Sequence, residues 1–256
     1  MSLNFPRQRE LRLRKAPLAE VICQIRFPPI LRITREEPSS FQEIIRKRFP
    51  ILEMEQGFVL KMPGLGSAEA ASAETRRRIF RFQTADHLVS ITLAPDFCAV
   101  STNRYSHWSD FAADLALASE ATLCVYEPAF ASRIGLRFVN RFTRANTGAQ
   151  DVGELWGMLR PGLVAPLHGE AWSDPSSMLL QLVVPDDPAK LAIRTAYGVE
   201  DGEPFLVLDF DYFEEDGLPL DDLLSRCERY HAVIYDAFRW CVPPDKMRAF
   251  DPIEDE

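Results

Sequence analysis

The stretch Arg133-Ile134-Gly135-Leu136-Arg137-Phe138-Val139-Asn140-Arg141-Phe142 is the most regular pattern in the chain and decides the fold class. Its larger apolar side chains are Ile134, Leu136, Phe138 and Phe142, all at even positions, whereas its three arginines stand at odd positions. Successive side chains of a strand point to opposite faces of the sheet. The stretch therefore predicts a strand with one face in the core and three guanidinium groups on the other.

An earlier stretch, Val21-Ile22-Cys23-Gln24-Ile25-Arg26-Phe27, alternates in the same way and also ends in Arg-Phe. Behind each of these strands the patterns predict a helix, three more strands and a long amphipathic helix, over roughly 18–127 and 133–242. We therefore predict an α+β protein of two similar β-α-β-β-β-α halves. The sheet or sheets are antiparallel, and the long helices pack on one face. Coincidence is the alternative, because the two halves share an element order and hardly any letters.

The chain divides into a basic N-terminal arm (1–16), a first half (17–128), a second half (129–245) and an acidic tail (246–256). Expected strands lie near 76–84, 87–94, 97–105, 177–184, 190–197 and 204–213. Expected helices lie near 40–49, 109–126, 151–159 and 220–242. Loops are expected at 63–75, 145–150 and 160–176.

Local signals refine this division at several points. Ser40 with Glu43 three residues later predicts a capping box at a helix start. The arm is expected to be solvated and mobile, with an edge strand around Leu11-Arg12-Leu13-Arg14 as the alternative. The acidic end of the chain is expected to fray.

Composition narrows the function classes. The 256 residues carry a formal net charge of −9, which argues against nucleic acid and anionic membranes as the main partner. The chain begins without a signal-peptide pattern and has no apolar run of membrane-spanning length. Its five cysteines are an odd number without close pairs, typical of reduced thiols in the cytoplasm.

Three segments carry a resemblance. They are Ala16 to Phe27, the spaced aromatics Tyr105, Trp108 and Phe111, and Arg133 to Phe142. Together they resemble the signatures of a sporadically distributed family of uncharacterised bacterial proteins of about this length. The resemblance implies a bacterial source and brings no activity or catalytic residue.

The strongest candidate site is the charged face of two strands in the second half. Arg133, Arg137 and Arg141 share one strand face, and Asp209 and Asp211 share the polar face of the strand over 204–213. Arginines bind phosphate or carboxylate groups through paired hydrogen bonds, and two nearby acids are suited to a divalent cation. The alternative is a solvated sheet face whose arginines and aspartates pair with each other.

Secondary candidates lie in the first half. Arg78 and Arg81, with Arg76-Arg77 before them, form a basic cluster beside the 63–75 loop. Its charge is suited to nucleic acid, and the favoured alternative is a solvated strand edge protected by charge. Tyr105 and His107 lie where a strand joins a helix, a common place for sites, and structural packing is the alternative there.

The familiar motifs of catalysis are missing from the sequence. The four histidines share no metal-ligand spacing, and there is no Cys-x-x-Cys pair, P-loop or nucleophile elbow. We therefore predict no catalytic residue, metal or cofactor, and we lean away from an enzyme.

The sequence favours a binding module that recognises a protein or a small anionic ligand through the charged sheet face and the 63–75 loop. One alternative is a metal-assisted hydrolase that acts on a phosphate-containing substrate. A structural subunit of an assembly is the third, and it allows a homo-oligomer.

Overall fold

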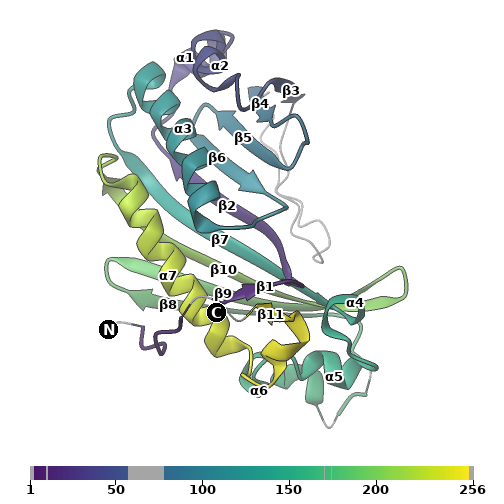
Figure 1. Cartoon of the computed structure of the whole chain (residues 1–256). Helices are drawn as coiled ribbons and strands as arrows, with labels where there is room; N and C mark the ends of the chain where they lie inside the picture. Colours follow the sequence, from purple (N-terminus) through teal and green to yellow (C-terminus); the bar gives the residue numbers. More distant parts are fainter. Residues whose placement is uncertain (1–2, 10, 57–77, 170, 174, 254–256) are drawn as a thin grey trace.

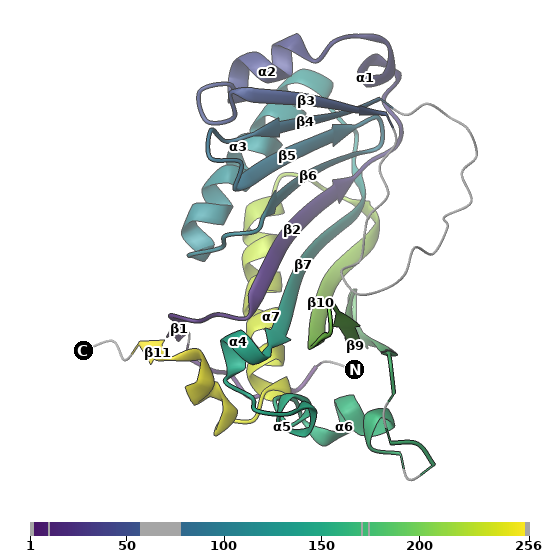
Figure 2. The same ribbon diagram turned by 90° about the vertical axis from the view of Figure 1, so that its right-hand side faces the viewer.

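One antiparallel sheet is the centre of the protein (Figures 1 and 2). The computed structural model describes residues 3–9, 11–56, 78–169, 171–173 and 175–253. Across these residues the strands of the sheet are β2 (Leu18–Arg26), β3 (Ile51–Gln56), β4 (Arg78–Gln83), β5 (Val89–Ala94), β6 (Phe97–Thr102), β7 (Ala131–Thr143), β8 (Met178–Asp186), β9 (Ala189–Glu200) and β10 (Glu203–Leu218). Their order in space is β3-β4-β5-β6-β2-β7-β10-β9-β8. The predicted α+β class with an antiparallel sheet is confirmed, and both halves of the chain contribute to one sheet.

The connections on the two sides of the central β2–β7 pair follow the same order. In each half the first strand lies at the centre, the last strand lies beside it, and the others run outward in reverse chain order. The first half has four strands after β2, whereas the prediction had three, because β3 was not expected. The two halves therefore differ in strand number, and the duplication itself stays a prediction.

Two long helices cover one face of the sheet. They are α3 (Trp108–Tyr126) and α7 (Leu223–Cys241), and both lie on the same side in Figures 1 and 2. The shorter helices are α1 (Leu31–Arg35), α2 (Ser39–Ile45), α4 (Arg144–Thr147), α5 (Val152–Trp156), α6 (Pro161–Val164) and the 3-10 helices η1 (Ala165–His168) and η2 (Lys246–Phe250). The packing of both long helices on one face agrees with the prediction. Within the described ranges, no helix is both long enough and apolar enough to cross a membrane.

The core lies between this helix layer and the sheet. On β7, Ile134, Leu136 and Phe142 are fully buried, as the alternating pattern predicts. On β10, Leu208 and Phe210 are fully buried in the same layer. Removal of this much apolar surface from water is the main driving force for the fold.

The two ends of the chain meet. Strand β1 (Arg12–Leu13) pairs with β11 (Pro252–Ile253), so the edge-strand alternative describes this part of the arm better than a solvated arm. Met247 and Phe250 are buried in η2, so this part of the acidic tail packs against the body of the protein. Fraying was expected of 253–256, and 254–256 lie outside the described residues.

Some local expectations were wrong. Helix α2 begins at Ser39 behind Pro38, so Ser40 is too late in the helix to cap it, and no side chain caps this helix. The stretches 145–150 and 160–176, expected as loops, contain the short helices α4, α6 and η1. The 63–75 loop lies outside the described residues.

Candidate functional site

The helix-free face of the sheet brings together the five main candidates from the sequence. Arg137 lies directly opposite Asp211 in the β7–β10 register, and Asp209 lies opposite Val139. Because residues two apart on a strand share a face, Arg133 and Arg141 project to the same side. The predicted constellation therefore exists as a charged surface over β7, β10 and β9, which we call the charged face.

Asp209 is the centre of the charged face. Arg137 donates from Nε to Asp209 Oδ1 and from Nη2 to Oδ2, each at 2.8 Å, in a bidentate pair. Arg194, on the adjacent strand β9, donates from Nη1 to Asp209 Oδ2 at 3.1 Å. Asp209 is only 1% exposed. Its carboxylate is thus taken out of water and held by two guanidinium groups.

The remaining arginines of the charged face are also paired. Arg133 donates to Asp211 Oδ1 at 2.8 Å, and Arg141 donates to a Glu200 carboxylate oxygen. Their guanidinium groups also lie over aromatic rings, Arg133 over Phe213 at 4.4 Å and Arg141 over Phe205 at 4.3 Å. All three predicted arginines are therefore engaged by acids of the same face.

A further acid borders this network. Glu20 on β2 lies opposite Val139 of β7, and burial raises the pKa of its carboxyl against the opposing effect of Arg137 and Arg81. The candidates predicted from the sequence did not include Glu20, Arg194 or Glu200. Arg194 was detectable in principle, because it is the charged residue on the polar face of the strand predicted over 190–197.

The described arginines of the basic cluster lie on β4, which pairs with β3 on one side and β5 on the other, so the alternative of a charged strand edge was wrong. Arg78 pairs with Glu37 and lies over the Phe80 ring at 5.6 Å. The positive charge of Arg81 opposes the rise in the pKa of the Glu20 carboxyl. Arg76 and Arg77 lie outside the described residues. Neither described arginine is placed in a cavity with the other candidates.

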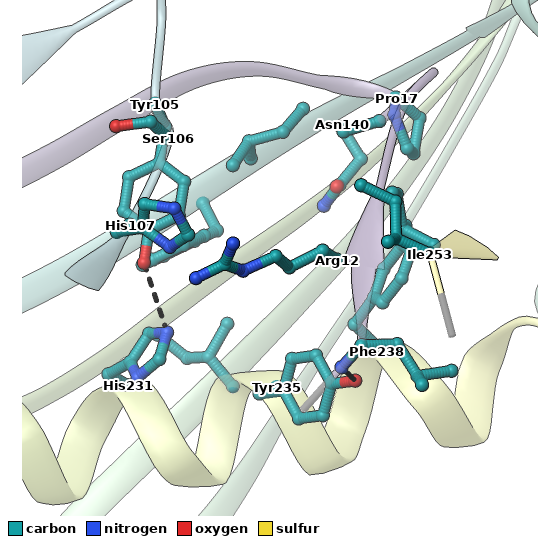
Figure 3. A pocket seen from close by; sticks show the side chains of 16 residues that line it. Arg12, Pro17, Tyr105, Ser106, His107, Asn140, His231, Tyr235, Phe238 and Ile253 are labelled. Carbon is teal, nitrogen blue, oxygen red and sulfur yellow. Dashed lines mark hydrogen bonds between the residues drawn. The ribbon is translucent and has the colours of Figure 1, made fainter. Parts of the chain in front are cut away.

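The other secondary candidates, Tyr105 and His107, line a cavity on the helix side of the sheet. The cavity has a volume of about 510 Å³ and lies between residues 11–18, the segment before α3, β7, α7 and β11 (Figure 3). Its apolar lining includes Leu11, Leu13, Leu18, Phe138, Ile234, Phe238 and Ile253. This size and composition are typical of sites for small molecules.

His231 forms one wall of the cavity through its contacts with Tyr105 and Trp108. The Tyr105 hydroxyl and His231 Nε2 are 3.2 Å apart, and the His231 ring stacks on Trp108 with a centroid distance of 4.7 Å and an interplanar angle of 11°. Burial lowers the pKa of His231 to about 4. The imidazole is therefore neutral near pH 7 and offers hydrogen bonding to the cavity without a charge.

Arg12 supplies the positive charge of the cavity. Its backbone is held by the pairing of β1 with Ile253, and its side chain extends into the space between His107 and Tyr235 (Figure 3). Among the described residues, its guanidinium forms no hydrogen bond or ion pair. By contrast, Arg14 two residues later lies 3.8 Å from Asp251.

Asn140 adds a buried amide to the same cavity. It is 4% exposed, and its Nδ2 donates to the Leu208 carbonyl oxygen at 3.1 Å. No hydrogen bond to its Oδ1 is formed by a described residue. Asn140 occupies a core-facing position of β7 among apolar residues, so a polar break in that alternation was the available sequence signal.

The segment over the cavity is tied to α7 by backbone groups. The Leu11 N–H donates to the Tyr235 hydroxyl at 2.8 Å, which itself donates to the Arg9 carbonyl at 3.0 Å. The Gln8 N–H donates to Asp236 Oδ1 at 2.9 Å. These bonds hold Gln8, Arg9 and Leu11 against α7 and so position Arg12.

No metal centre accompanies either site. Across the described ranges there is no group of three or more His, Cys, Asp or Glu side chains placed to hold a metal ion.

Comparisons with protein-family models and with curated proteins find no match for the chain. The family resemblance of the sequence therefore stays a prediction.

Proposed function

We propose that the protein is a binding protein that holds a small amphipathic ligand in the cavity between β7, α7 and residues 11–18. The ligand has an apolar body and one carboxylate or similar anionic group. This keeps the binding-module class favoured by the sequence and moves the site from the charged face to the opposite side of the sheet.

One observation carries the proposal. Arg12 is exposed to solvent, its side chain extends into a cavity lined by both apolar and polar residues, and it has no acidic partner among the described residues. A guanidinium group binds a carboxylate through two parallel hydrogen bonds. An anionic ligand group would give Arg12 a partner that none of the described residues supplies.

The other polar groups suit the same ligand. Asn140 and the Tyr105–His231 pair offer uncharged hydrogen-bonding groups on the cavity wall. Because His231 is neutral near pH 7, Arg12 is the group that selects for charge. The apolar walls then select for the body of the ligand through the hydrophobic effect.

The charged face supports this choice by contrast. Arg133, Arg137 and Arg141 already bind acids of the chain, so an anionic ligand would have to displace a bonded carboxylate from each. The metal-assisted hydrolase stays a prediction, as the described residues offer no metal cluster in its support. A cytoplasmic location belongs to our proposal, in line with five free cysteines.

Displacement of a fluorescent probe tests the proposal. The probe is 1-anilinonaphthalene-8-sulfonate, which combines an aromatic body with one anionic group, and the competitors are decanoate and decanol. We expect saturable binding of one probe per chain and stronger displacement by decanoate than by decanol. Loss of the charge-assisted hydrogen bonds in Arg12→Gln should weaken decanoate binding by about 1.5 kcal/mol, roughly tenfold, and leave decanol unchanged.

Arg14→Gln is the matched control, because Arg14 lies on the same segment and pairs with Asp251. It should bind decanoate like the unchanged protein. Equal displacement by decanoate and decanol would overturn the proposal, as would a decanoate affinity that Arg12→Gln leaves intact. Near-ultraviolet circular dichroism shows whether each variant keeps its tertiary structure, so that a change in probe binding is not caused by unfolding.

A further inference from the structure

Strand β8 forms one edge of the sheet and exposes apolar side chains on both of its faces. Leu179 is 49%, Leu182 45% and Val183 52% exposed. An edge strand also presents unpaired N–H and C=O groups, so it readily pairs with another strand. Strand β8 is therefore a surface with both apolar contacts and directed hydrogen bonds to offer.

The opposite edge of the sheet differs in charge. Strand β3 carries the exposed acid Glu53, whereas β8 has no charged residue from Met178 to Pro185. Charges on an edge strand discourage pairing with a copy of itself. This protection is present on β3 and absent from β8.

The hairpin between β8 and β9 determines which residues of β8 face outward. Asp186 and Ala189 flank a two-residue turn, so they form the hydrogen-bonded pair that closes the hairpin. Backbone groups of alternate residues point to opposite sides of a strand. Leu179, Gln181 and Val183 therefore direct their N–H and C=O groups to the free edge. Pro185 falls in the same set, where its missing N–H removes no bond to β9.

We propose that β8 pairs antiparallel with β8 of a second copy of this chain, with Gln181 at the two-fold axis. Leu179 of one copy then lies opposite Val183 of the other on the helix-free face. Leu180 lies opposite Leu182 on the helix side. The exposed apolar side chains of β8 thus cover one another, and the outward N–H groups of both strands are paired.

The surrounding residues fit this arrangement. Gln181, the polar side chain at the axis, accepts a hydrogen bond from Arg194 Nε at 3.0 Å, so its oxygen is turned toward β9. The antiparallel register places Asp186 of one copy opposite Ser176 of the other, so no two acids meet. A two-fold axis perpendicular to the sheet also keeps both helix layers on the same side. The two nine-stranded sheets then form one continuous sheet across the dimer.

Sedimentation equilibrium over a range of concentrations tests the pairing. The unchanged protein should show twice the mass of one chain, dissociating on dilution. Val183→Lys should weaken the dimer by more than about tenfold, because each copy loses an apolar cross-strand pair. The matched control is Val199→Lys, since Val199 is 51% exposed but lies beyond the end of β8. It should leave the dimer intact.

A cross-link tests the register independently. In a Cys124→Ser background, which removes the exposed native thiol, Gln181→Cys should oxidise to a covalent dimer. Residues of a hydrogen-bonded antiparallel pair have Cα atoms about 5.5 Å apart, within reach of a disulfide. Leu182→Cys should cross-link far more slowly, because it lies opposite Leu180.

Two results would overturn the proposal. One is the mass of a single chain at every concentration of the unchanged protein. The other is a dimer that Val183→Lys leaves as tight as before. Faster cross-linking through Leu182→Cys than through Gln181→Cys would refute the register. None of these results depends on ligand binding in the cavity, so the two proposals fail separately.

Discussion

Arg137 and Arg12 differ in their surroundings and in their bonded partners. Arg137 lies on the charged face in a bidentate pair with the buried Asp209. Arg12 lies on the other side of the sheet in a cavity and has no acidic partner among the described residues. The region richest in charge is therefore the one where the charges satisfy each other. An exposed arginine that lines a cavity and has no acidic partner among the described residues is the better sign of a ligand site.

The difference follows from how each arginine is placed. Neighbouring antiparallel strands put Arg137 and Arg194 next to the aspartates of β10 at fixed spacing, so local pairing is unavoidable. Arg12 reaches its cavity on a segment that crosses α7 and pairs with the end of the chain. The first arrangement contributes to the fold, whereas the second leaves a functional group available.

The largest expected effect is on the stability of the charged face. Asp209→Ala should lower the free energy of unfolding by about 3–5 kcal/mol, because it leaves two partly buried arginines without their shared carboxylate. Urea denaturation followed by circular dichroism measures the change. Glu200→Ala is the control on the same face. Glu200 is exposed and pairs with Arg141, so its loss should cost less than about 1 kcal/mol. Equal costs for the two variants would contradict the contrast between buried and exposed pairs.

The next largest expected effect is on the pH dependence of the free energy of unfolding, and it comes from His231 in the cavity wall. Burial lowers the pKa of His231 to about 4, below the ordinary histidine value of about 6.5. Between these two values the unfolded chain binds a proton at this residue and the folded chain does not. Stability therefore falls as pH falls through this window, by about 3 kcal/mol in total.

Replacement of the imidazole isolates this contribution. His231→Phe keeps an aromatic ring against Trp108 and should flatten the loss of unfolding free energy between pH 7 and pH 4 by that amount. His87→Asn, which removes an exposed histidine, should leave the profile unchanged. Parallel profiles for His231→Phe and the unchanged protein would show that His231 is not held neutral by burial.

The sequence predicted the sheet better than the site. The alternation in β7 predicted both of its faces, because the arginines stand at odd positions and the large apolar residues at even ones, with Asn140 as a polar break. Strand β3 was missed although Leu52-Glu53-Met54-Glu55 alternates apolar and acidic residues, because four residues are the shortest alternation that indicates a strand. The cavity was beyond prediction because it joins residues 11–18 to α7 and β11. Only tertiary packing brings these segments together, although Asn140 and His231 on core faces were local signs of it.

A crossed comparison of Arg12→Gln and Arg137→Gln tests the central claim most directly. Unfolding free energy and decanoate affinity are measured for both variants under one condition. We predict that Arg12→Gln loses roughly tenfold in decanoate affinity at almost unchanged stability, since its guanidinium has no bonded partner among the described residues. Arg137→Gln should lose stability and keep its affinity, because it uncovers the buried Asp209. The opposite pattern, with affinity lost in Arg137→Gln and kept in Arg12→Gln, would contradict the account and return the site to the charged face.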